Sequence, residues 1–154
     1  MDYGNHWTTV IIEDIISQHP KIIPTLKKVK DTDFFIDNSA VDLKVTYIPK
    51  GDYDASFLNR KITREDKLKL AKWLYENQGA RRFSAFPRLY VVLAKKDKLE
   101  DSWKLKRNFD LIKRKINEYF NSENPLFNLD FEFGKKDGKK IVHSTTCGLI
   151  FIID

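Results

Sequence analysis

Asp33, Asp42 and Lys44 are the residues of this chain whose types and spacing could do chemistry. Asp42 and Lys44 belong to the alternating run 41–48, so on a β-strand both side chains point to one face, about 6.6 Å apart. Asp33 opens the apolar run before it, and tight pairing of the two runs would bring Asp33 close to Asp42. Two carboxylates beside an ammonium group can hold a hard divalent cation and an attacking water.

The stretch that carries these residues has the pattern of a β-hairpin. Its first run, 34–36, is apolar and aromatic, and 37–39 (Asp-Asn-Ser) are turn-forming residues. In the second run Val41, Leu43 and Val45 alternate with polar residues. This alternation predicts one face directed into the core and an opposite face that carries Asp42 and Lys44.

The spacing of Asp33, Asp42 and Lys44 resembles that of the PD-(D/E)xK nuclease superfamily, which has the restriction-endonuclease-like fold. Thr32 stands where the family motif has a proline, so the motif reads T-D-F…V-D-L-K. The segment 40–47, AVDLKVTY, is similar to the same segment in the EcoRV type of type II restriction endonucleases. The resemblance covers this hairpin of the chain.

The resemblance implies metal-dependent hydrolysis of phosphodiester bonds in DNA. Asp33 and Asp42 would bind Mg²⁺, or Mn²⁺ in its place, together with the main-chain carbonyl of Leu43. Lys44 would orient the attacking water or help to deprotonate it. Members commonly carry a Glu on a helix before the hairpin, and Glu13 is the candidate for that peripheral ligand. The expected role is that of a type II restriction endonuclease. A Holliday-junction-resolving or repair nuclease of the same superfamily is the alternative, because the chain is short for an enzyme that must also read sequence.

The same residues also have plainer interpretations. Asp42 and Lys44 could lie on the solvated face of an edge strand, Asp33 could be a turn residue, and Glu13 could be a surface acid. Two other functional classes then remain: a non-catalytic DNA-binding subunit with this fold, and a basic α/β interaction protein without a nucleic-acid partner. Metal-dependent cleavage of plasmid DNA separates the enzyme from the first class. Absence of salt-sensitive DNA binding would support the second.

Charge favours a polyanionic partner. The 154 residues include 28 Lys and Arg against 22 Asp and Glu, a net charge of +6. A guanidinium group binds phosphate in a fork and reads guanine edges in the same way, which singles out the pair Arg81–Arg82. The pair could equally neutralise the C-terminus of the preceding helix. Further candidates for DNA contact follow the hairpin: Lys50, Arg60 and Lys61.

Several classes of protein are not expected. The lone Cys147 and the absence of zinc-ligand spacing argue against a disulfide framework or a zinc site, and an intracellular, cytoplasmic protein fits. The first residues do not read as a signal peptide, and no apolar run is long enough for a membrane span. Neither glycine-rich phosphate-binding motif is present, so no nucleotide cofactor is expected. A double-strand cut needs two sites, which predicts a homodimer.

The length predicts one nuclease-like domain, 1–154, of the α/β class. We expect a central mixed sheet of about five strands flanked by helices on both faces. Predicted helices cover 7–19 with a cap at Thr8 or Thr9, a short segment within 21–30, 63–79 from a capping box at Thr63, and 101–121. Beyond the hairpin, predicted strands cover 88–94, 127–133, 141–143 and 149–153, with a turn at Asp137–Gly138.

Overall fold

The central sheet confirms the predicted α/β class. The structure, a computed structural model, describes residues 3–29, 32–77, 85–122 and 125–154. In these ranges the chain forms a six-stranded sheet of order β1-β2-β3-β4-β6-β5. The strands are β1 Ile22–Val29, β2 Thr32–Ile36, β3 Ser39–Tyr47, β4 Arg88–Ala94, β5 Phe127–Lys136 and β6 Lys139–Ile153. The sheet is mixed, because β3, β4 and β6 run parallel while the outer pairs are antiparallel.

The hairpin of β2 and β3 is confirmed. Phe34 pairs with Val41 and Ile36 with Ser39, which leaves a two-residue turn at Asp37 and Asn38. Both turn residues have positive φ, 47° and 66°, as a type I′ turn requires. Such a turn matches the twist of the strands, so it sets the register that faces residue 33 toward residue 42.

The expected short helix within 21–30 is wrong, because this segment forms β1. Ile22 pairs with Ile36 and Pro24 with Phe34. β1 is the edge strand of the sheet, where a proline without an N–H is tolerated. Pairing with β2 therefore overrides the local preference, and β1 brings the strand number to six.

The crossover from β3 to β4 runs through a 3₁₀ turn, Ser56–Asn59, and α2, Arg64–Glu76. The capping box at its start is confirmed, since the Thr63 side chain accepts from the Asp66 N–H and the Asp66 side chain accepts from the Thr63 N–H. The expected stop at Gly79 lies outside the described residues. The crossover places Asp42 of β3 level with Arg88, the first residue of β4.

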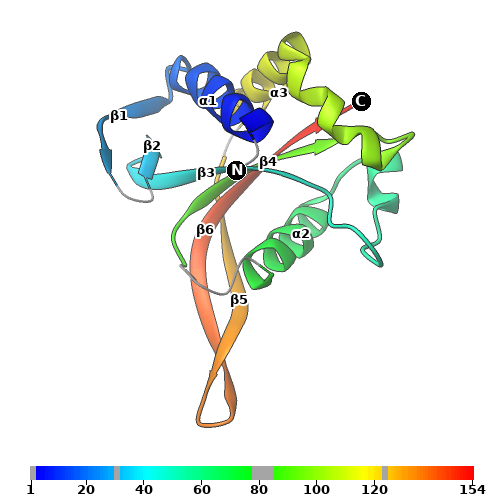
Figure 1. Cartoon of the computed structure of the whole chain (residues 1–154). Helices are drawn as coiled ribbons and strands as arrows, with labels where there is room; N and C mark the ends of the chain where they lie inside the picture. The colour runs from blue at the N-terminus through cyan, green and yellow to red at the C-terminus, as the bar shows by residue number, and fades with distance from the viewer. Residues whose placement is uncertain (1–2, 30–31, 78–84, 123–124) are drawn as a thin grey trace.

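Helices cover both faces of the sheet, as predicted (Figure 1). One core cluster joins Val41 and Leu43 to helix α1, Tyr3–Ser17, and helix α3, Phe109–Asn121. The other joins Tyr90 and Val92 to helix α2.

The predicted cap of the first helix is wrong, because the chain is already helical at Tyr3 and Thr8 lies buried within α1. No helix in the described stretches has the length and apolar character needed to cross a membrane.

The continuous helix expected over 101–121 is wrong in part. Leu99–Arg107 is a 3₁₀ segment, and α3 begins only after Asn108. The Asn108 side chain accepts a hydrogen bond from the Leu111 N–H and so starts a new helix. The predicted apolar stripe is buried at Leu105, Ile112, Ile116 and Phe120, whereas Phe109 is 46% exposed because it lies in the first turn of α3.

The strands expected at 141–143 and 149–153 are one continuous strand, β6. The turn at Asp137–Gly138 is confirmed, with φ values of 53° and 76°. β5 and β6 pair as far as Lys136 and Lys139, and their outer part extends away from the sheet as a two-stranded ribbon (Figure 1). This ribbon arises because pairing of β6 with β4 begins only at Cys147.

Candidate functional site

Asp33 and Asp42 lie side by side on neighbouring strands. Phe34 pairs with Val41, and both side chains belong to the core cluster under α1 and α3. Because side chains alternate along a strand, the next pair, Asp33 and Asp42, faces the opposite side of the sheet. The Leu43 N–H donates to Asp33 Oδ2 at 2.7 Å, which holds the Asp33 carboxylate against β3. The predicted convergence of the two aspartates is thus present in the structure.

Lys44 completes the group predicted from the hairpin. Its Nζ lies 3.3 Å from Asp42 Oδ2. The Lys44 side chain is 51% exposed and the Asp42 side chain only 14%, so the ammonium group faces solvent beside a largely covered carboxylate. The group therefore reaches solvent at the lysine.

Arg88 is a member of this group that sequence reasoning missed. Its Nε lies 3.7 Å from Asp42 Oδ2, and its side chain is 12% exposed. Its Nη1 donates to the Tyr90 hydroxyl at 3.4 Å, and its guanidinium lies 5.4 Å from the centre of the Tyr75 ring. Within the described part of the chain Nε has no hydrogen-bond partner. A signal was present, since an Arg opens the buried strand after Pro87, but only the register of β3 and β4 reveals its partner.

The electrostatic environment of Asp42 opposes its charge. Burial raises the pKa of this carboxyl above its ordinary value, and the Lys44 ammonium acts against that rise. A hydrogen bond to the Asp33 carboxyl and the charge of Asp33 raise the pKa further. An additional cation beside the two aspartates would stabilise their ionised forms.

The third acidic candidate is not brought to this group. Glu13 lies on α1, and α1 packs in the core cluster on the other face of the sheet from Asp42. Across the residues that the structure describes, no three His, Cys, Asp or Glu side chains gather in a way that could hold a metal ion. The Leu43 carbonyl, the main-chain candidate, points toward β2 because its N–H does so, and both groups of one strand residue point the same way. The oxygen donors at the site are thus Asp33, Asp42 and this carbonyl.

The candidates for DNA contact lie elsewhere. Lys50 follows the carboxyl end of β3, at the end of the sheet opposite Asp42 and Arg88. Arg60 and Lys61 precede α2, and the Arg60 guanidinium already binds Asp66 through two hydrogen bonds of 2.6 and 2.9 Å. The pair Arg81–Arg82 lies outside the described residues. None of the described candidates therefore adjoins the aspartates.

Comparison with known proteins adds no relative. No protein-family model, no curated protein and no solved structure matches this chain. The function is therefore inferred from the chemistry of Asp33, Asp42, Lys44 and Arg88.

Proposed function

We propose that this chain hydrolyses phosphodiester bonds in DNA at Asp33, Asp42 and Lys44, with Mg²⁺ or Mn²⁺ as cofactor. The observation that carries the proposal is the meeting of two carboxylates from neighbouring strands beside a half-exposed ammonium group. Three residues that the hairpin spacing singles out lie together on one face of β2 and β3. A solvated edge strand does not account for this, because Asp42 is largely buried and β3 is an interior strand.

The donor set fits a small hard cation. Mg²⁺ binds oxygen ligands and is often held by only one or two carboxylates, with water completing its coordination. Asp33, Asp42 and the Leu43 carbonyl are donors of this kind. Burial raises the pKa of Asp42 above its ordinary value although the Lys44 ammonium acts against the rise, so a bound cation would further stabilise the ionised carboxylate. Such an ion, when bound, neutralises charge on a phosphate and lowers the pKa of a nearby water.

Each protein group has a role that follows from its position. Asp33 is held against β3 by the Leu43 N–H, which keeps its carboxylate beside Asp42, where both could ligate a cation. Lys44 reaches solvent beside Asp42, where its ammonium group can orient a water and stabilise negative charge that develops on the phosphate. Arg88 offsets the charge of Asp42 from the β4 side and keeps the carboxylate in place. Glu13 is not needed for these roles.

The leading biological role remains that of a type II restriction endonuclease acting as a homodimer, with a junction-resolving or repair nuclease as the alternative. One observation favours a second class, a DNA-binding subunit that does not cut. Asp42 has two basic neighbours in the structure, Lys44 and Arg88, and so already has cationic partners without a metal. A protein that had lost catalysis could retain its fold in this way.

Cleavage of DNA tests the proposal. The protein is incubated with supercoiled, linear and four-way-branched DNA, with Mg²⁺, with Mn²⁺ and with EDTA. We expect metal-dependent cleavage that Asp42→Asn abolishes and that Asp52→Asn, in an exposed loop, leaves unchanged. Preference for one DNA form would separate the two nuclease roles. DNA binding without cleavage of any form would favour the non-catalytic subunit.

A further inference from the structure

The ribbon formed by the outer parts of β5 and β6, residues 130–144, is here named the basic arm. Its base lies next to Cys147, which is level with Arg88 at the start of β4. Between Thr146 and the turn, β6 pairs with β5 alone, over roughly 23 Å at about 3.3 Å per residue. Figure 1 shows the tip of the arm extending beyond the helices, while its base lies beside α2. Residues 134–140, which form the tip of the arm, are exposed, so the tip does not pack against the core of the protein.

Four lysines surround the tip of the basic arm. Lys135 pairs with Lys140, and Lys136 pairs with Lys139, so like charges stand directly opposite each other on the two strands. Such pairs destabilise a hairpin. Only Asp137 lies among them in the sequence, which leaves a net charge of +3 over 135–140 (four lysines less one aspartate). Lys140 is partly neutralised by Glu132 at 3.3 Å. A bound polyanion would relieve the repulsion between the lysines.

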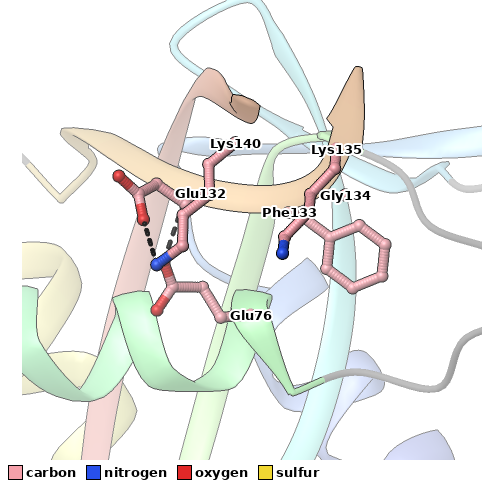
Figure 2. A pocket seen from close by; sticks show the side chains of 6 residues that line it. All are labelled: Glu76, Glu132, Phe133, Gly134, Lys135 and Lys140. Carbon is pink, nitrogen blue, oxygen red and sulfur yellow. Dashed lines mark hydrogen bonds and ion pairs between the residues drawn. The ribbon is translucent and has the colours of Figure 1, made fainter. Parts of the chain in front are cut away.

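The base of the basic arm is fixed to the body of the protein. The Glu132 N–H donates to Glu76 Oε2 at 2.8 Å, which ties β5 to the end of α2 (Figure 2). His143 Nε2 hydrogen-bonds the Phe133 carbonyl at 3.0 Å across the two strands. Between Glu132 and Lys135 the register shifts at Gly134, whose φ of 78° favours glycine and bends the ribbon. Hydrogen bonds therefore fix the base of the arm to the protein, and its tip carries the lysines.

The basic arm and the candidate site lie at the same end of the sheet. Asp42, Arg88 and Cys147 are level on three neighbouring strands. Strands β4 and β6 are parallel, and β4 starts at Arg88. The residues of β6 before Cys147 therefore extend past the start of β4, at the end of the sheet where Asp42 and Arg88 lie. A rod-shaped polyanion that lies across this end of the sheet would meet both the lysines of the arm and Lys44.

We propose that the basic arm enters a groove of duplex DNA beside the candidate site, with its lysines on the flanking phosphates. This inference rests on the proposed function, since DNA is the substrate there. The major groove of B-DNA admits a two-stranded β-ribbon, and a ribbon tipped by lysines suits a groove bounded by two phosphate backbones. Lysine contacts to phosphate add affinity without sequence preference.

The test measures binding of a 30-base-pair duplex in EDTA over a range of salt concentrations. The arm variant is Lys136→Ala/Lys139→Ala, and the control is Lys96→Ala/Lys98→Ala, which makes the same charge change at the opposite end of β4. Each phosphate contact contributes about 0.9 to the slope of log affinity against log salt. We expect the arm variant to flatten the slope by about 1.8. The control should keep the wild-type slope, and the arm variant should melt no lower than wild type.

The outcomes separate the arm from the proposed function. If the salt dependence of binding flattens equally in both double variants, or does not flatten in the arm variant, the proposed role of the arm is wrong. Cleavage by wild type with Mg²⁺ in that case would leave the hydrolytic function standing. A flattened slope for the arm variant alone, together with no cleavage by wild type, would support the arm as a DNA-binding element and reject hydrolysis.

Discussion

Asp42 and Arg88 meet across two parallel strands, with 3.7 Å between Asp42 Oδ2 and Arg88 Nε. Both side chains are largely buried, at 14% and 12% exposure. The contact is longer than a hydrogen bond, so it acts through charge. It joins β4 to a group whose other members all come from the hairpin of β2 and β3. The candidate site is thus a product of the crossover through α2 as well as of the local motif.

Replacing Arg88 tests this contact. Arg88→Met should lower the free energy of unfolding by about 1–3 kcal/mol, because it leaves the Asp42 carboxylate without one cationic neighbour in a partly buried place. The double variant with Asp42→Asn should recover part of the loss, since the two residues are coupled. Urea unfolding at pH 7 gives these values, with the exposed Arg64→Met as control. Additive losses in the double variant would show that the two charges do not interact.

The raised pKa of Asp42 predicts a pH dependence of stability. A carboxyl whose pKa is higher in the folded than in the unfolded chain stabilises the fold below the unfolded value, about 3.9, and loses that contribution as pH rises through the folded value. The wild type should therefore lose stability relative to Asp42→Asn as pH rises above about 4. Unfolding measured from pH 3.5 to pH 7 tests this. A difference that stays constant over this range would contradict the assigned environment.

Metal should act on the same carboxyls. Mg²⁺ or Mn²⁺ at millimolar concentration should raise the melting temperature, because the ion relieves repulsion between Asp33 and Asp42. Asp42→Asn should remove most of that rise, whereas Asp52→Asn should keep it. Thermal melts with and without metal make the comparison. Equal stabilisation of all three proteins would place the ion elsewhere.

Some features of this structure can be predicted from the sequence, and others cannot. The alternation after Val41 predicted the shared face of Asp42 and Lys44, because a period of two is a local property. The pairing of Arg88 with Asp42 is not local, since it depends on how α2 packs and so on the register of the parallel strands. The segment around Pro24 was mispredicted for the same reason. Its partner β2, rather than its own composition, makes it a strand.

The arrangement of α3 against β6 can be tested at Gly148. A Cβ at this position would meet the Tyr119 hydroxyl at less than contact distance and the Pro125 carbonyl oxygen at 2.8 Å. Gly148→Ala should therefore cost about 1–3 kcal/mol of stability, typical of overpacking. Tyr119→Phe in the same chain should recover part of this cost, because it removes the hydroxyl. A fully stable Gly148→Ala protein would show that α3 does not approach β6 in this way.

Hydrolysis by Lys44 and the two aspartates is the central claim, and single-turnover cleavage of duplex DNA with Mg²⁺ tests it most directly. Lys44 is half exposed beside Asp42, so its removal should spare the fold and DNA affinity to within a few-fold. A group that acts on the transition state affects the rate instead. We expect Lys44→Ala to cut at least about a hundredfold more slowly. Lys44→Arg should not restore the rate, because a guanidinium group is wider and stays protonated. The exposed Lys96→Ala should cut normally. Cleavage by Lys44→Ala at the wild-type rate, or no cleavage by wild-type protein that binds the duplex, would contradict the claim.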